Sequence, residues 1–149
     1  MPMRCAIVTQ DRQLFEGEAD MVVAPGTEGI MGILPNHAPL LTTLAFGELI
    51  VRHGEEEEIF AVAGGVMEVQ PDAVVVLADS GEHVVEIDEE RAEKARLRAE
   101  ELLAEGPPPD TDEYLAIQAA LRRSELRLST ARKYQRKAPR VRIEGGGET

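Results

Sequence analysis

The sequence predicts an α+β protein, in which an N-terminal all-β flattened sandwich or barrel precedes a C-terminal antiparallel two-helix hairpin. Two observations lead to this prediction. The first 86 residues contain short apolar and β-branched runs separated by turn signals. From Ile87 onward, apolar residues recur at helical spacing, and three prolines after Gly106 interrupt the pattern. We therefore expect a β-sandwich domain over 1–86, a helical hairpin over 87–137 and a flexible tail over 138–149.

The predicted strands are rich in Val, Ile, Leu and Ala and poor in aromatic residues. The runs are MRCAIVT (3–9), QLFEGEA (13–19), DMVVAP (20–25), GELIVRH (47–53), EIFAVAG (58–64), GVMEVQP (65–71) and AVVVLAD (73–79). Turn signals follow three of them, at His53-Gly54, at Pro71-Asp72 and at Asp79-Ser80-Gly81. Strands at this spacing, with no helical pattern between them, are typical of a sandwich or flattened barrel.

Both helices have recognisable starts. Asp88 is a suitable N-cap, and Glu89 and Glu90 place negative charge in the first turn. Asp110, with Glu113 three residues later, resembles a capping box for a second helix that runs to about Lys137. The predicted seam pairs Ala92, Ala95, Ala99 and Leu102 with Tyr114, Ile117, Leu121, Ser124, Leu128 and Ala131. Because a buried methyl contributes only about 0.8 kcal/mol, we expect a hairpin that closes conditionally.

The net charge of −12 is unevenly distributed. Residues 1–86 contain three basic and fifteen acidic side chains, whereas residues 87–149 contain thirteen of each. Residues 121–143 carry nine Lys or Arg and a single acid, which gives this stretch a net charge of +8. Such asymmetry indicates more than one partner surface. Nucleic acid is not an expected partner, because Tyr134 is the only aromatic residue in the basic stretch.

Several classes of protein and site are not expected. No run approaches the roughly 18 to 20 apolar residues of a membrane-spanning helix, and the chain does not begin like a signal sequence, so we expect a soluble protein that is not exported. Cys5 is the only cysteine, which excludes an intramolecular disulfide and favours a buried, unreactive thiol. The three scattered histidines form no metal-binding pattern. We predict no metal site and no required cofactor.

Four arginines stand on the two predicted helices at spacings that can bring them together. Arg91 and Arg98 are seven residues apart on the first helix, and Arg123 and Arg127 are four apart on the second. Guanidinium groups at one level repel each other unless an anion intervenes, and their geometry matches phosphate oxygens. A polyphosphate ligand is therefore one interpretation. The other is that the arginines pair on a solvated surface with acids of the same helices, namely Glu93, Glu100, Glu101 and Glu125.

Four segments of the chain resemble the epsilon subunit of bacterial F-type ATP synthase, in that family's order and spacing. They are GTEGIMGILPNHAPLLTTLAFGELIV (26–51), AVAGGVMEV (61–69), IDEERAEKARLRAEELL (87–103) and ALRRSELRLSTA (120–131). The resemblance covers nearly the whole chain to about Lys137. It implies a β-sandwich followed by two helices, and a non-catalytic role in a proton-translocating complex.

The resemblance also implies partners and a place. The sandwich would attach to the central gamma subunit and rest on the c-ring, coupling proton-driven rotation to ATP synthesis. The helices would extend along gamma and inhibit ATP hydrolysis by the catalytic beta (and alpha) subunits. The protein would be peripheral, on the cytoplasmic face of the bacterial plasma membrane, and would reach the membrane only through the c-ring.

Charge offers a physical reason for that inhibition. By resemblance, the extended second helix approaches acidic segments of the beta subunits, which a basic helix would meet favourably. We therefore expect a set of cations on this helix to carry the inhibition: Arg122, Arg123, Arg127, Arg132, Lys133, Arg136 and Lys137.

Some members of this family bind ATP in the closed hairpin through a motif of the type I/L-D-x-x-R-A and arginines on both helices. The resemblance therefore implies that ATP is a regulatory ligand, which would select the closed state. The residues that match are Glu82, Ile87, Asp88, Arg91, Ala92, Arg98, Arg123 and Arg127. Glu82, Ile87 and Asp88 are expected near the base and ribose, and the arginines near the phosphates.

The loop that contains His37 has two interpretations. A structural role, with the imidazole bonded to the backbone, competes with an acid–base role for which no hydrolytic set is evident. By resemblance, this region contributes to the c-ring and gamma contacts, so we expect interface residues at Glu28, Ile30, Met31 and His37. Ile30 departs from some relatives, which carry an acid at this place.

Two other classes of function remain as alternatives. One is a stand-alone module that senses ATP or another anion and has no tight protein partner. The other is a small β-domain enzyme that uses His37 with Asp72 or Asp79. Co-purification with gamma would separate the first alternative from a stalk subunit, and loss of turnover in His37→Ala would support the second.

Overall fold

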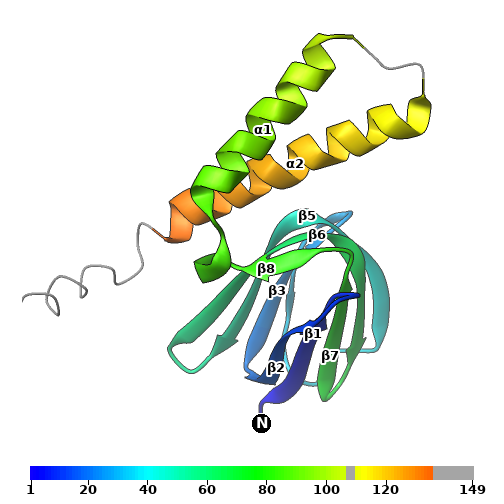
Figure 1. Cartoon of the computed structure of the whole chain (residues 1–149). Helices are drawn as coiled ribbons and strands as arrows, with labels where there is room; N and C mark the ends of the chain where they lie inside the picture. Colours follow the sequence, from blue (N-terminus) through cyan, green and yellow to red (C-terminus); the bar gives the residue numbers. More distant parts are fainter. Residues whose placement is uncertain (107–109, 136–149) are drawn as a thin grey trace, which may run out of the picture. The chain divides into compact units, whose positions relative to one another are not determined.

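Strands fill the first part of the chain and helices the second (Figure 1). The computed structural model describes residues 1–106 and 110–135. The chain divides into two compact units, Met1–His83 and Val84–Thr149. The sequence-based boundary after Glu86 differs slightly, because a short 3-10 helix, η1 (Val84–Glu86), groups with the helical unit. The predicted tail over 138–149 and the end of the predicted hairpin at Lys137 lie outside the described residues.

The first unit is a β-sandwich made from one continuous sheet. Its strands are β1 (Met3–Val8), β2 (Gln13–Ala19), β3 (Met21–Gly26), β4 (Gly29–Ile33), β5 (Leu40–His53), β6 (Glu56–Gln70), β7 (Ala73–Ala78) and β8 (Gly81–His83). Their order is β2-β1-β7-β6-β5-β3-β4, and β8 pairs with β6. The strands β2 and β4 end this path, so the sheet does not close into a barrel. The predicted all-β sandwich is confirmed.

The two long strands allow one sheet to form two layers. Strand β6 pairs with β8 over Phe60 to Val62 and with β7 from Gly65 onward. Where the pairing changes partner, Gly64 and Gly65 have φ values of 87° and 139°, which only glycine adopts readily. A Cβ on Gly65 would lie 2.3 Å from the carbonyl oxygen of Leu77, so no side chain fits there. Glycine at these positions lets the strand bend sharply and serve both parts of the sandwich.

The core of the sandwich follows from strict alternation. Strand β7 buries Val74, Val76 and Ala78 and exposes Val75 and Leu77, as expected for a strand with one face in the core and one face in solvent. Within residues 1–106 and 110–135, Phe60 is the only fully buried aromatic side chain, and the other large buried ones are aliphatic or Met. Cys5 is buried in this core, and its burial raises the thiol pKa to about 12. The thiol therefore stays protonated and unreactive at neutral pH.

The second unit contains α1 (Glu89–Ala104) and α2 (Thr111–Tyr134). The predicted N-caps are confirmed: Asp88 accepts a hydrogen bond from the backbone N–H of Arg91, and Asp110 accepts one from that of Asp112. Gly106, with φ of 97°, follows the end of α1, where a left-handed residue commonly stops a helix.

Candidate functional site

The two helices meet through small side chains. Figure 1 shows that α1 and α2 lie close together where α1 begins and α2 ends, and diverge toward the segment that connects them. The buried residues are Ala92 and Ala99 on α1, and Ser124, Leu128, Thr130 and Ala131 on α2. The predicted seam is confirmed at Ala92, Ala99, Ser124, Leu128 and Ala131. It is wrong at Ala95, which is exposed, and its remaining members are only partly buried.

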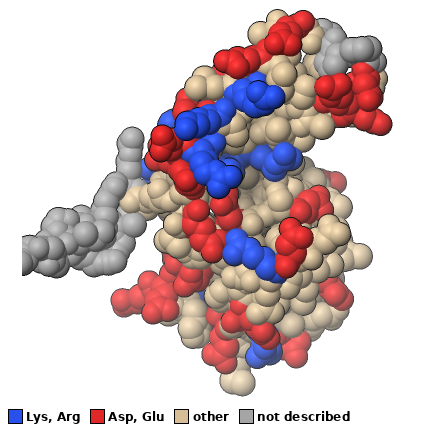
Figure 2. All heavy atoms as spheres, in the orientation of Figure 1, with Lys and Arg blue, Asp and Glu red and all other residues tan. Residues whose placement is uncertain are grey.

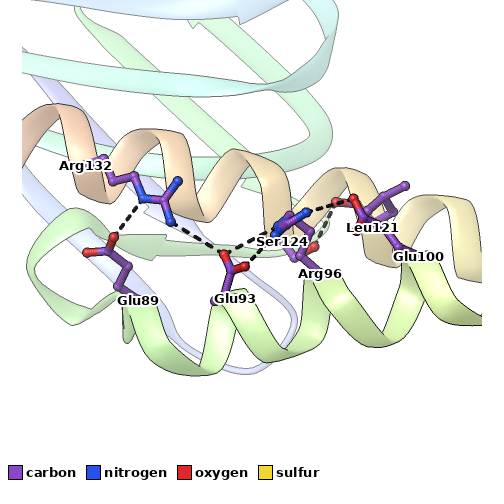
Figure 3. A network of polar contacts seen from close by, with 7 residues as sticks. All are labelled: Glu89, Glu93, Arg96, Glu100, Leu121, Ser124 and Arg132. Carbon is purple, nitrogen blue, oxygen red and sulfur yellow. Dashed lines mark hydrogen bonds and ion pairs between the residues drawn. The ribbon is translucent and has the colours of Figure 1, made fainter.

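A network of charged side chains runs along one flank of this seam (Figure 3). Arg132 of α2 donates to Glu89 of α1 at 2.8 Å and to Glu93 at 3.5 Å. Arg96 of α1 donates to Glu93 and, at 2.8 Å, to Glu100. The carboxylate of Glu93 therefore receives arginine hydrogen bonds from both helices. A polar cleft of about 360 Å³ lies at this flank, lined by Glu93, Arg96, Glu125, Leu128, Ser129 and Arg132.

The network favours the ionised form of the Glu93 carboxylate. The hydrogen bond from Arg96, followed by the charges of Arg96 and Arg132, holds the pKa of Glu93 below its ordinary value of 4.5. The same hydrogen bond, with the charges of Glu100 and Glu93, raises the pKa of Arg96. The pairs within α1 have the spacings of three and four residues at which helical side chains meet.

A neutral contact joins the end of α2 to the start of the unit. The side-chain amide of Gln135 donates to the carbonyl oxygens of Val84, at 2.7 Å, and of Ile87, at 3.1 Å. Val84 is the first residue of the 3-10 helix and Ile87 follows it, so one amide ties the C-terminal end of α2 to the chain that enters α1.

Sequence reasoning did not assign these roles to Arg96, Glu89 or Gln135, and it counted Arg132 only among the inhibitory cations. The spacing of Glu93, Arg96 and Glu100 was a readable signal within one helix. The contacts of Arg132 and Gln135 depend on how the two helices are aligned, and the sequence contains no direct signal for that.

The four arginines expected near phosphates lie on the flank opposite the network. At about 100° per residue, Arg91 and Arg98 point to the other side of α1 from Glu93, and Arg123 and Arg127 to the other side of α2 from Arg132. Figure 2 shows Lys and Arg side chains gathered over the two helices. Within residues 1–106 and 110–135, the guanidinium groups of Arg91, Arg98 and Arg123 make no ion pair.

This arrangement bears on the two interpretations of the arginine set. Glu93 and Glu100, which the solvated-surface interpretation assigned to these arginines, pair instead with Arg96 and Arg132. Of the other expected nucleotide residues, Asp88 caps α1, Ile87 is buried, and Ala92 is buried in the seam. Glu82 belongs to the other unit, in β8, opposite Ala61 of β6.

The expected inhibitory cations have varied surroundings on α2. Arg122, Arg123, Arg132 and Lys133 are exposed and Arg127 is partly buried. Arg132 is held by two carboxylates, and Lys133 lies 5.0 Å from the centre of the Tyr134 ring. Arg136 and Lys137 lie outside the described residues.

Three of the four expected interface residues line one groove on the sandwich. Glu28, Ile30 and Met31 border a groove of about 660 Å³ between the β3–β4 turn and β5. Ile30 is 81% exposed and Leu41, also in the lining, is 71% exposed. Such side chains commonly mark an interaction site when they cluster. Sequence reasoning missed Leu41, although the run of Leu40 and Leu41 after a proline was visible.

His37 is not part of this groove lining. Its ring Nδ1 lies 2.7 Å from the carbonyl oxygen of Ala38, in the loop between β4 and β5. The described residues contain no hydrogen bond from His37 to Asp72 or Asp79. The geometry therefore gives no support to the alternative of a small β-domain enzyme that uses His37. No group of potential metal ligands is found among these residues, and none of their helices is long and apolar enough to cross a membrane.

Comparison with protein-family models accounts for both units. The beta-sandwich domain of the ATP synthase Delta/Epsilon chain matches residues 2–84, and the long alpha-helix domain of the same chain matches residues 86–132. The chain belongs to the ATP synthase delta/epsilon chain family. The sequence-based resemblance is confirmed.

Relatives within the delta/epsilon family support this assignment along nearly the whole chain. The ATP synthase epsilon chain of Dehalococcoides mccartyi strain BAV1 is 50% identical over 141 residues, which cover 93% of this chain and 98% of the relative. That of Acidithiobacillus ferridurans is 47% identical over 133 residues, which cover 89% and 93%.

Solved structures of the same fold come from mitochondrial complexes. A chain in the cryo-EM structure of Euglena gracilis mitochondrial ATP synthase, OSCP/F1/c-ring, matches with a TM-score of 0.70 and 25% identity, covering 84% of this chain and 78% of that one. A chain of the Tetrahymena thermophila mitochondrial ATP synthase central stalk/c-ring matches with a TM-score of 0.62, covering 88% and 97%, and at 14% identity it shows the shared fold alone.

We predict that Glu93→Gln destabilises the helical unit at neutral pH and has little effect in acid. Because the pKa of Glu93 is lowered in the hairpin, its ionised form adds stability above the ordinary value of 4.5, and this stability is lost as the pH falls through the lowered pKa. Thermal melting of the helical circular dichroism signal across pH measures the effect. Glu101→Gln, an exposed glutamate of the same helix, is the control. Identical pH profiles for parent and Glu93→Gln would contradict the prediction.

Proposed function

We propose that the chain is the epsilon-type subunit of the central stalk of an F-type ATP synthase, without catalytic activity of its own. The observation that supports this best is that both domains of the family match in order, over residues 2–84 and 86–132. The match to a chain of the Euglena gracilis OSCP/F1/c-ring structure adds support at the level of the assembly. The subunit would couple proton-driven rotation to ATP synthesis and restrain ATP hydrolysis through its helices.

The sandwich is the part that we assign to the rotor. Its groove presents Ile30 and Leu41 to solvent beside Glu28, which is the chemistry of an interface with an apolar centre and a polar rim. The gamma subunit and the c-ring would cover this surface. The protein would then be peripheral, at the cytoplasmic face of the bacterial membrane, with the c-ring as its only link to the bilayer.

We predict that Ile30→Asp combined with Leu41→Asp weakens association with gamma and the c-ring by at least about tenfold, because each apolar side chain contributes about 1.5 to 3 kcal/mol when buried. Co-purification of the subunit with a gamma–c-ring assembly measures the change. Leu97→Asp, at an exposed leucine of α1, is the control. If the double variant co-purifies as fully as the parent, the groove is not part of the interface. Failure of the parent to co-purify would instead favour a stand-alone ATP- or anion-sensing module.

The second helix is the part that we assign to inhibition. The basic set on α2 and just beyond it would meet acidic segments of the catalytic beta subunits when the hairpin is open, where opposite charges attract across an interface. Closing the hairpin would withdraw this helix. The charge asymmetry of the chain, with a basic stretch of +8 after an acidic domain, supports the assignment.

Alanine at all seven cations of the set should relieve suppression of ATP hydrolysis by the assembled complex. The set is Arg122, Arg123, Arg127, Arg132, Lys133, Arg136 and Lys137. Steady-state hydrolysis of complexes rebuilt with parent and variant subunit measures the relief, which should shrink as salt is added. Alanine at Arg4, Arg12 and Arg52, in the sandwich, controls for a general change in charge. If the variant complex hydrolyses ATP as slowly as the parent complex, the prediction is wrong.

ATP would be the ligand that favours the closed hairpin. The four arginines of one flank, two on each helix, can be bridged by phosphate oxygens only while the helices lie together. A ligand that binds one state alone shifts the equilibrium toward that state. Because three of these guanidinium groups form no ion pair within the described residues, they are available to an anion.

We predict that Arg123→Ala with Arg127→Ala weakens ATP binding by the isolated chain more than tenfold, because hydrogen bonds between charged groups are worth about 1.5 to 3 kcal/mol each. Isothermal titration calorimetry measures the affinity. Arg122→Ala is the matched control, since the helical period places Arg122 on another face of α2. An absence of binding heat in the parent would refute the ATP proposal, whatever the variants do.

A further inference from the structure

Polar contacts join the two helices where α1 begins and α2 ends. Arg132 reaches Glu89 and Glu93, and Gln135 reaches the carbonyls of Val84 and Ile87. Toward the connector the helices diverge (Figure 1). The contacts thus join the last turn of α2 to the first turns of α1 and the chain before it, which is where the hairpin is narrowest.

Apolar packing between α1 and α2 themselves is modest. The buried seam residues of the two helices are Ala92, Ala99, Ser124, Leu128 and Ala131, of which Leu128 has a large apolar side chain; Val84 and Ile87, which precede α1, are also buried. Stabilisation by burial grows with the apolar area that is removed from water, and alanine and serine offer little of it. Contacts between polar groups therefore carry a larger share of closure here than in a leucine-rich helical pair.

We propose that Glu89, Glu93, Arg132 and Gln135 form a latch that holds the hairpin closed without a bound nucleotide. The inference rests on the proposed function, in which the hairpin opens and closes. The ion pairs of Arg132 with Glu89 and Glu93 lie on the flank away from Arg91, Arg98, Arg123 and Arg127, so these pairs and the phosphate contacts act at separate places and their effects on closure combine. Gln135 donates to the carbonyl of Ile87, a residue expected near the base and ribose.

Arg96 is a positioning residue of the latch. It remains within α1, where it binds Glu93 and Glu100, and so it does not itself join the helices. The side chain of Arg96 is only 26% exposed. Its guanidinium holds the Glu93 carboxylate where Arg132 reaches it. Fixing one partner in advance reduces the side-chain entropy that an ion pair loses when it forms.

The latch also determines when Arg132 is available. In the closed hairpin, the guanidinium of Arg132 is bound by two carboxylates of α1. The same cation belongs to the set that we assign to inhibition, so it must leave Glu89 and Glu93 before it can meet another acid. Removing these two carboxylates therefore promotes opening while every cation of α2 is retained.

The test measures hairpin closure in the isolated full chain without nucleotide. Spin labels on Leu97→Cys and Leu115→Cys, both at exposed positions of the parent, report the separation of α1 and α2 by pulsed electron paramagnetic resonance. The native Cys5 does not interfere, because it is buried and its thiol stays protonated. The test variant carries Glu89→Gln and Glu93→Gln. The control carries Glu101→Gln and Glu105→Gln, two exposed glutamates near the other end of α1.

The test variant should lower the ratio of closed to open hairpin by about two- to fivefold for each exposed ion pair that is lost. The control should match the parent. Gln135→Ala should shift the ratio in the same direction, and added salt should open the parent more than the Glu89→Gln, Glu93→Gln variant. A distance distribution that is equal in parent and test variant at low salt overturns the latch.

A second measurement separates failure of the latch from failure of the proposed function. In the assembled complex, the Glu89→Gln, Glu93→Gln subunit should suppress ATP hydrolysis more strongly than the control subunit. If the hairpin opens in the isolated variant but hydrolysis is unchanged, the inhibitory role fails and the latch stands. If neither closure nor hydrolysis changes, the latch itself is refuted, whereas the groove experiment still decides the stalk assignment.

Discussion

The narrow, small-residue contact between α1 and α2 is the constraint on which the behaviour of the helical unit depends. Alanine and serine at the seam let two helices approach, but they bury too little apolar surface to make closure decisive. Helices in proteins owe most of their stability to tertiary packing, which is thin along this seam. In the proposed latch, charged and polar contacts add to closure, and they respond to salt and pH in ways that an apolar core does not.

The sandwich has the opposite character. Its core joins residues from seven of its eight strands, and most of the larger side chains in it are completely buried. Close packing of this kind tolerates little rearrangement. The chain thus combines a closely packed sandwich with a helical unit for which we propose an adjustable closure.

The sequence was a good guide wherever local rules decide the outcome. The caps at Asp88 and Asp110, the stop at Gly106 and half of the predicted seam residues were predictable, because each depends on the local spacing of residues along one helix. The resemblance added the family and the order of the domains. Nucleotide binding and inhibition remain predictions that only experiments on the protein can decide.

What the sequence could not provide was alignment between distant segments. The partners of Arg132 and Gln135 lie more than thirty residues away, and they depend on which turns of α1 and α2 face each other. The groove beside Ile30 likewise forms only because β4 and β5 flank the same strand, β3. The exposure of Ala95 has the same cause. A helical period identifies an apolar stripe, but it does not indicate how much of that stripe the partner helix covers.

The parallel pairing of β1 with β7 has a consequence for biogenesis. Arg4 lies opposite Ala73, so the first strand of the sandwich pairs with a strand near the end of the same domain. Pairing between such distant segments is slow, because a long stretch must be closed into a loop before any contact is gained. On the ribosome, β1 can form its hairpin with β2 early, but it must wait for β7 to emerge before the sheet is complete. The helices are synthesised after the sandwich, so the nascent sandwich can be complete before they exist.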